Sequence, residues 1–214
     1  MSINEAREIV QEACVELVKA GLVARTWGNI SARVDDEVFV ITPSGRRYED
    51  LTVTDMVPVK ISDLTHEGSI KPSSEKGLHA EIYKQNKGVN AVIHTHQTHA
   101  STVAAARKDI TGIGKKHSAL LGTTVRVAAY GLPGTGKLAR ATAEALGASN
   151  AALMANHGAV CVGKKMRDAF AVARALEEAA EEFIARSFLS ASGQNGPFSL
   201  AAMHTFYLNM MAER

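Results

Sequence analysis

Apolar residues recur every three or four positions at the start of the chain, from about residue 4 to residue 20. The recurring positions are Ala6, Ile9, Val10, Ala13, Cys14, Leu17 and Val18. This spacing places the apolar side chains on one face of a helix. The pattern therefore predicts an amphipathic helix that has Asn4 as its N-terminal cap and ends at Gly21.

Short apolar stretches bounded by turn residues then alternate with further helical patterns. Residues 108–122 show no clear pattern. One predicted helix begins at a serine cap, with Glu75 in its first turn. Strands are predicted within 26–33 and at about 37–42, 56–61, 91–97, 124–129, 151–154 and 159–162, and helices at about 74–86, 100–106, 137–147, 165–189 and, after a polar linker at 190–196, 198–212.

This alternation continues through the 214 residues without a break in composition. It predicts one α/β domain over residues 1–214, with a mixed, largely antiparallel sheet and helices on both faces. A content of 46% hydrophobic and 21% charged residues is typical of a globular protein with a substantial core.

The charge balance bears on one class of partner. The chain has 24 lysines and arginines against 22 acidic residues, which does not favour nucleic-acid binding.

The chain lacks an N-terminal secretion signal and an apolar run of the roughly 20 residues that span a bilayer, so no membrane association is expected. Cys14 and Cys161, the only cysteines, lie in apolar surroundings. We therefore expect buried thiols and a cytoplasmic protein.

Two histidines on one predicted strand are the first candidates for chemistry. Side chains alternate along a strand, so His94 and His96 point to the same side, roughly 6–7 Å apart. With His157 from a later turn, they would hold one metal ion with an open fourth position, as catalytic zinc sites do. Alternatively, they are buried histidines that only satisfy their own hydrogen bonds.

Three loops combine hydroxyl or amide groups with exposed backbone N–H groups: Gly28-Asn29, Thr42-Pro43-Ser44-Gly45 and Ser73-Ser74. Such groups bind phosphate at tight turns and helix N-termini without lysine. Each loop taken alone is more often a turn with a cap than a phosphate site. Glu75 alone is a first-turn glutamate, but beside a phosphate and a metal its carboxylate would move a proton.

Residues 131–137 match the spacing G-x-x-x-x-G-K of a nucleotide-binding loop between a predicted strand and a helix. The next residue in that motif is a serine or threonine that binds magnesium, and here it is Leu138. The stretch is therefore interpreted as an ordinary loop.

Five motifs in order resemble the class II aldolase/adducin family, and most of all its L-fuculose-phosphate and deoxypentulose-phosphate aldolase branches. The resemblance extends from the first predicted helix to the helix that ends near residue 189. The motifs are Gly28-Asn29-Ile30-Ser31, Thr42-Pro43-Ser44-Gly45, Ser73-Ser74-Glu75, His94-Thr95-His96 and Asn156-His157-Gly158.

The resemblance implies a three-layer α/β/α fold with a nine-stranded, mainly antiparallel sheet, and a homotetramer with active sites between subunits. It implies a zinc ion in each subunit and a Glu75 that acts as acid and base. A ketose 1-phosphate would be cleaved reversibly into dihydroxyacetone phosphate and a small aldehyde. By position, the zinc ligands would be His94, His96 and His157, and the phosphate-binding groups would be Asn29, Ser44, Gly45, Ser73, Ser74 and the backbone of Gly28.

The chain departs from the family pattern on the aldehyde side. The fuculose-cleaving branch uses a tyrosine from a neighbouring subunit to handle the aldehyde oxygen. This sequence has Lys115 near that place, followed by Lys116, while Tyr207 is the candidate for a second such tyrosine. We expect a lysine of this pair to contact the aldehyde portion of the substrate.

Other reactions occur on the same scaffold. The epimerase branch of the family typically has aspartate where this chain has Glu75, which favours aldol cleavage; a decarboxylase and a dehydratase remain alternatives. A non-catalytic adducin-like interaction module would have lost its zinc ligands, whereas all three histidines are present. Neither the aldehyde nor the metal used in the cell follows from the sequence.

Overall fold

The computed structural model describes residues 1–22, 27–192, 199, 201–202, 205 and 208–209. Seven of the strands in these ranges form one sheet in the order β3-β2-β1-β4-β9-β8-β7, and two form a small second sheet, β5-β6. Neighbouring strands are antiparallel except β7 and β8, which are parallel. The strands are β1 Asn29–Arg33, β2 Val38–Ile41, β3 Val57–Lys60, β4 Ala91–Thr95, β5 Ile110–Thr111, β6 Thr124–Val125, β7 Val127–Ala128, β8 Ala151–Met154 and β9 Gly158–Gly163.

The expectation of a single nine-stranded sheet is therefore wrong. The segment predicted as one strand at 124–129 changes partner at Arg126, whose carbonyl accepts a hydrogen bond from the Leu153 amide at 2.8 Å. Before this residue β6 pairs with β5, and after it β7 pairs with β8. The change of partner separates two strands from the main sheet.

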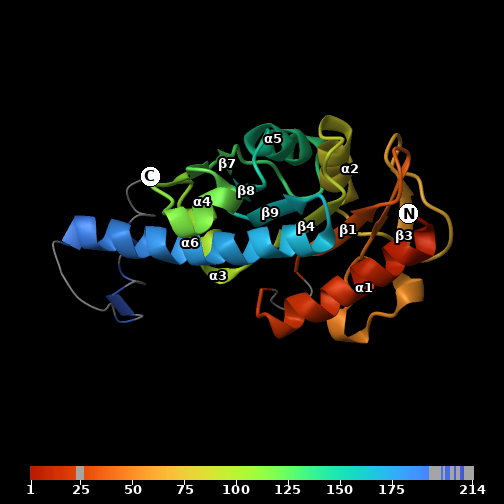
Figure 1. The fold of residues 1–214 in the computed structure, drawn as a ribbon, viewed down its shortest axis with the longest axis horizontal. Coiled ribbons are helices and arrows are strands. Elements are labelled where there is room, and N and C mark those ends of the chain that lie inside the picture. Colours follow the sequence, from red (N-terminus) through yellow and green to blue (C-terminus); the bar gives the residue numbers. More distant parts are fainter. Residues whose placement is uncertain (23–26, 193–198, 200, 203–204, 206–207, 210–214) are drawn as a thin grey trace.

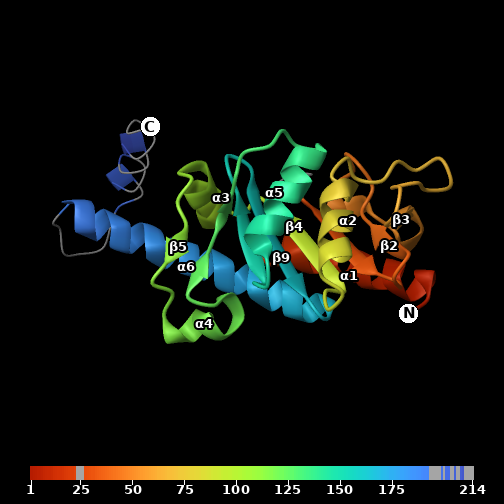
Figure 2. The same ribbon diagram turned by 90° about the horizontal axis from the view of Figure 1, so that it is seen from above.

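Helices cover both faces of the main sheet, which gives three layers (Figure 1 and Figure 2). One face is covered by α1, α3 and α6, and the other by α2 and α5, while α4 packs against α6. None of the helices in the described ranges is long and apolar enough to cross a membrane. The helices are α1 Ile3–Lys19, α2 Lys76–Gln85, α3 Thr98–Ala105, α4 Lys115–Leu121, α5 Gly136–Leu146 and α6 Met166–Ser192, with 3₁₀ turns η1 Tyr48–Asp50 and η2 Val53–Asp55.

The central strands are apolar on both sides because each side faces a separate core. Along β4, Val92 contributes to the core beneath α2 and α5, and Ile93 to the core beneath α1, α3 and α6. Along β9, Val160 contributes to the core beneath α2 and α5, and Cys161 to the core beneath α1, α3 and α6. Strands that are buried on both faces have continuous apolar sequences. Because Val92 and Ile93 must each face their own core, the register of β4 is fixed, and so is the side to which the side chains after Ile93 point.

Two predicted helix caps are wrong. Ser2, not Asn4, caps α1: its Oγ accepts a hydrogen bond from the Glu5 amide at 3.2 Å, and Glu5 Oε2 accepts one from the Ser2 amide at 2.6 Å. At the other helix, α2 begins at Lys76 and Glu75 occupies the N-cap position without a capping bond from its side chain. The carboxylate of Glu75 is therefore free to point elsewhere.

Both thiols are buried and free, as expected. Burial raises the pKa of the Cys14 thiol to about 12, which makes it unreactive. The predicted linker at 190–196 and final helix at 198–212, together with Tyr207, lie largely or wholly outside the described residues.

Candidate metal and substrate site

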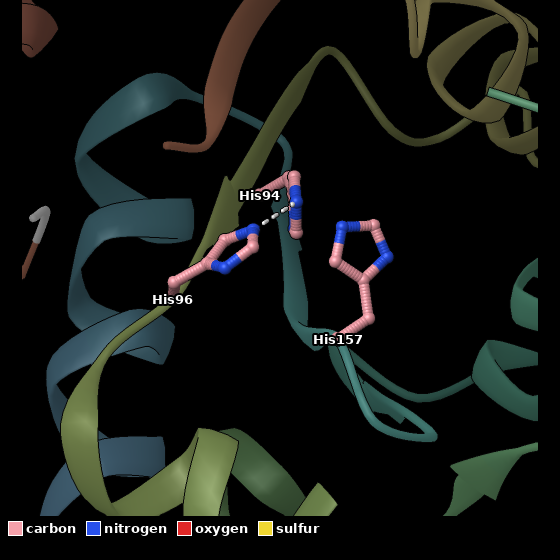
Figure 3. A group of neighbouring side chains, drawn as sticks. All are labelled: His94, His96 and His157. Atoms are coloured by element: carbon pink, nitrogen blue, oxygen red, sulfur yellow. Dashed lines mark hydrogen bonds between the residues drawn. The ribbon is translucent and has the colours of Figure 1, made fainter. Parts of the chain in front are cut away.

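The two histidines of the β4 motif bring their Nε2 atoms within 3.1 Å of each other (Figure 3). His94 is the fourth residue of β4, and His96 follows directly after the strand. The Nδ1–H of His94 donates to the carbonyl of Ala159 at 2.9 Å, so in the neutral ring the lone pair is on Nε2. A backbone bond of this kind orients many metal-binding histidines.

The third imidazole comes from the turn between β8 and β9. The turn is tight, with Asn156 at a φ of 56°, and the pairing of Thr95 with Ala159 places it beside β4. The ring of His157 lies 4.8 Å from that of His94 and 5.0 Å from that of His96, measured between centroids. One ligand atom from each ring lies within 4.8 Å of the others.

Glycines at two positions allow this close approach. A Cβ added to Gly158 would lie 2.4 Å from the Thr95 carbonyl oxygen and 3.3 Å from the His94 ring. A Cβ on Gly28, whose φ is +102°, would lie 2.5 Å from the His94 carbonyl oxygen. Both contacts are too short for any other residue, so these glycines are required by the packing around the histidines.

Glu75 reaches the same point from the start of α2. Its Oε2 lies 3.2 Å from Nε2 of His94, and its Oε1 lies 3.4 Å from Nε2 of His157. Burial raises the pKa of this carboxyl, but the hydrogen bond and charge of His94, the charge of His157 and the bond from Asn29 outweigh burial. Together they hold the pKa of Glu75 well below its usual range, so it is a carboxylate.

The pKa values of two of the histidines are lowered in this setting. Burial and the charge of neighbouring histidines lower the pKa of His96 to about 3 and that of His157 to about 4, although Glu75 opposes the shift. Neutral imidazoles present lone pairs, which is the form that binds a metal. Three ring nitrogens around one point, with His94 oriented by a backbone carbonyl, fit a zinc-type ion with an open position.

The three predicted phosphate loops line one cavity of about 200 Å³ beside the histidines. Two of the loops are held together by the backbone: the amide of Ser44 donates to Lys71 and that of Ser73 to Thr42, both at 3.0 Å. The lining residues are Trp27, Gly28, Asn29, Pro43, Ser44, Gly45, Arg46, Tyr48, Ser73, Ser74, Glu75, His96, Pro133 and His157.

The aldehyde-side candidates are not brought to this cavity within one chain. Lys115 and Lys116 lie on α4 and are absent from its lining, and Nζ of Lys116 instead donates to Glu178 Oε2 at 2.6 Å. Tyr207 lies outside the described residues.

Three residues near the site escaped the sequence analysis. Arg46 and Tyr48 line the cavity directly after the Thr42–Gly45 loop, which was the available signal. His79 is completely buried and hydrogen-bonds to Asn29. It stands four residues after Glu75, and this helical spacing was a signal that the two share a face of α2.

The loop with nucleotide-binding spacing has a packing explanation. A Cβ on Gly131 would lie 2.6 Å from the backbone of Leu138, so the loop must approach α5 closely. Thr135 caps that helix by accepting a hydrogen bond from the Leu138 amide at 3.4 Å. These contacts account for the glycine and threonine of the stretch.

Comparison with known proteins agrees with this site. Residues 8–184 match the family described as class II aldolase and adducin N-terminal domain, and the chain belongs to this family. The chain is 32% identical over 182 residues, 85% of each sequence, to 5-deoxy-D-ribulose 1-phosphate aldolase of Bacillus thuringiensis serovar kurstaki.

Solved structures show the same relationship. An L-fuculose 1-phosphate aldolase superposes with a TM-score of 0.81 at 28% identity, over 98% of this chain and 95% of that one. The L-fuculose-1-phosphate aldolase from Thermus thermophilus gives a TM-score of 0.74 at 26% identity, over 90% and 97% of the two chains. The named relatives are thus aldolases that act on sugar phosphates.

Proposed function

We propose that this protein is a metal-dependent aldolase that reversibly cleaves a ketose 1-phosphate into dihydroxyacetone phosphate and a small aldehyde. One observation carries the proposal: three imidazoles and the carboxylate of Glu75 converge at a cavity that the three phosphate-type loops also line. The sugar-phosphate aldolases among its relatives support the same assignment.

The loops supply the donors that a phosphate requires. Ser44, Ser73 and Ser74 offer hydroxyls, and Gly28 and Gly45 allow the backbone to approach closely because neither has a side chain. Hydroxyl and backbone donors at such turns bind a phosphate group directly. The phosphate would therefore anchor the substrate with its ketone toward the histidines.

Zinc is the ion that the donor set favours, with His94, His96 and His157 as ligands. When bound, a divalent ion would polarise the ketone and stabilise the negative charge that develops as the carbon–carbon bond breaks. The chain's own part is to hold the imidazoles in place: the bond from His94 to Ala159 orients one ring, and burial lowers the pKa of His96.

Glu75 is the proton carrier in this proposal. In cleavage, the hydroxyl on the departing carbon loses its proton and becomes the aldehyde carbonyl, and the electron pair of the broken bond remains on the carbon beside the ketone. The Glu75 carboxylate takes up the hydroxyl proton and then delivers it to that carbon. In synthesis, the Glu75 carboxylate removes the same proton. Its oxygens lie 3.2 and 3.4 Å from the ligand nitrogens of His94 and His157, so they reach a group bound there.

We further propose that the protein works as a homotetramer in which a neighbouring copy supplies the aldehyde-side contact. Within the single chain, Lys115 and Lys116 do not line the cavity. A second copy is therefore needed to bring either lysine to the aldehyde.

A coupled assay for dihydroxyacetone phosphate tests the proposed reaction. Zinc-loaded protein is given a panel of ketose 1-phosphates that differ in the aldehyde released, with Glu75→Gln as control. We expect release from at least one sugar and its loss in the variant. If zinc is bound and no sugar releases dihydroxyacetone phosphate, the aldolase reaction is rejected, and an epimerase, decarboxylase or dehydratase reaction at the same site is favoured instead.

A further inference from the structure

A buried chain of hydrogen bonds leads from the core to Glu75. The hydroxyls of Tyr83 and Ser31 are 2.7 Å apart, and Ser31 Oγ lies 2.6 Å from Nδ1 of His79. Nε2 of His79 lies 2.5 Å from Oδ1 of Asn29, whose Nδ2 lies 3.0 Å from Oε2 of Glu75. Tyr83, Ser31 and His79 have no exposed surface, and Asn29 is 3% exposed. Water therefore does not compete for these bonds.

The chemistry of the groups fixes the direction of every bond. A carboxylate only accepts, so the Asn29 atom that faces Glu75 is the amide nitrogen, and the Asn29 oxygen faces His79. His79 must then carry its proton on Nε2, and Nδ1 accepts from the hydroxyl of Ser31. The Ser31 oxygen in turn accepts from Tyr83. Ser31, His79 and Asn29 are each both donor and acceptor, and the last donor, Asn29, points at Glu75.

Asn29 is thus more than a phosphate-binding side chain. One hydrogen of the Asn29 NH₂ group is donated to Glu75. The second hydrogen is on the same nitrogen, and Asn29 lines the cavity. If the amide turned over, its oxygen would face the Glu75 carboxylate and the substrate phosphate, and both contacts would be repulsive. The bond from His79 to Oδ1 favours the orientation in which the NH₂ group faces Glu75.

We infer that His79 is a positioning residue: by donating to Oδ1 of Asn29, it holds the Asn29 NH₂ group toward both Glu75 and the substrate phosphate. The role rests on the proposed aldolase function, because it deepens the parts assigned there to Glu75 and the phosphate. The residue itself contacts neither substrate nor metal. Ser31 and Tyr83 support it by fixing the tautomer of its ring.

The test compares three variants of the full-length, zinc-loaded protein. His79→Leu removes both ring nitrogens, and His79→Gln keeps a side-chain N–H that can donate to Asn29. Ile82→Ala is the matched control because Ile82 lies on the same helix, is fully buried and takes no part in the chain of bonds. It reports the effect of loosening α2 alone.

For His79→Leu we expect kcat/KM to fall by about 10- to 100-fold, the usual cost of losing a group that orients a site residue. His79→Gln should recover most of this loss, and Ile82→Ala should stay near the wild type at a temperature where all variants are folded. A second readout is calorimetric titration of the metal-free protein with inorganic phosphate, in which we expect weaker binding only for His79→Leu.

Equal kcat/KM and equal phosphate affinity in His79→Leu and Ile82→Ala would overturn the inference. So would a wild-type protein that binds no inorganic phosphate. If the wild type cleaves no ketose 1-phosphate but binds phosphate with the expected order of variants, the proposed reaction fails while the role of His79 stands. The two ideas are therefore separable.

Discussion

Two clusters of histidine and glutamate occur in this molecule, with similar distances and different surroundings. In the first, Glu75 lies 3.2 Å from His94 and 3.4 Å from His157. In the second, between α4 and α6, His117 lies 3.6 Å from Glu178 and 3.5 Å from Glu182. The Glu75 side chain is 9% exposed, whereas those of Glu178 and Glu182 are 51% and 46% exposed.

The difference in exposure decides what each cluster can do. At the surface, water screens the carboxylates, and the pKa of Glu178 is lowered mainly by the hydrogen bond and charge of Lys116. In the first cluster, Glu75 is largely buried, and the pairing of β4 with β9 brings His157 beside His94 and His96. Within the described residues, only the histidines of this first cluster form a group of three or more ligands that could hold a metal ion.

The largest expected effect separates the clusters directly. Glu75→Gln removes the proton carrier, and we expect kcat to fall by about 10²- to 10⁴-fold, the range of general acid–base catalysis. Glu178→Gln makes the same chemical change at the surface cluster and should leave turnover unchanged. Steady-state kinetics on the preferred ketose 1-phosphate measure both. A similar loss in the two variants would contradict the distinction.

The next effect concerns charge at the cavity. Arg46 lines the cavity and pairs with Asp55. The hydroxyl of Thr52 donates a hydrogen bond to Oδ2 of Asp55. Guanidinium groups bind phosphate strongly, so Arg46→Gln should raise KM for the sugar phosphate about tenfold, with kcat little changed.

Arg47 provides the matched control for this change. It pairs with Glu49 and Asp50 at 3.6 and 3.9 Å and does not line the cavity. Arg47→Gln should leave KM unchanged. If both variants have the same KM as the wild type, Arg46 makes no contact with the phosphate.

Stability should depend on pH through the buried histidines. In the folded, metal-free protein the pKa of His157 is about 4, below the ordinary value of 6.5. Between these values the unfolded chain binds more protons, so folding stability is fully present above pH 6.5 and falls as the pH decreases toward 4. The loss is at most about 1.4 kcal/mol per pH unit for this residue.

Thermal unfolding of metal-free protein between pH 7 and pH 5 measures this slope. His157→Gln, which does not titrate, should flatten it. Equal slopes in the wild type and His157→Gln would show that the histidine is protonated as readily when folded as when unfolded.

The smallest effect on stability is expected at the surface. Lys116→Ala breaks its 2.6 Å contact with Glu178, and an exposed pair of this kind contributes less than about 1 kcal/mol.

In the synthesis direction, Lys115→Ala or Lys116→Ala should raise KM for the aldehyde without changing KM for dihydroxyacetone phosphate. Undiminished turnover in both variants would remove these lysines from the aldehyde site.

The sequence patterns predict the parts of the site that depend on local periodicity. Alternation along a strand correctly places His94 and His96 on one side, because both neighbouring cores fix the register of β4. The proximity of His157 depends on a pairing between strands about 60 residues apart in sequence, for which spacing carries no information. The sequence offers His157 as a candidate because it lies between two apolar runs, and the family resemblance implies the same ligand.

The errors arise where tertiary contacts override local preference. A Ser-Ser-Glu sequence reads as a helix cap, yet the side chain of Glu75 makes no capping bond and instead turns to Asn29 and His94. The stretch at 124–129 reads as one strand, but it exchanges partners at Arg126. Neither outcome is encoded by the neighbouring residues alone.

The most direct test of the site is the exchange of hydrogen between dihydroxyacetone phosphate and solvent without any aldehyde. In D₂O, zinc-loaded protein should catalyse exchange of one of the two hydrogens on the hydroxyl-bearing carbon, as followed by proton NMR. The exchange should disappear in Glu75→Gln and persist in Glu178→Gln. Absence of exchange in the wild-type protein, or its persistence in Glu75→Gln, would contradict the assignment of Glu75 as the proton carrier.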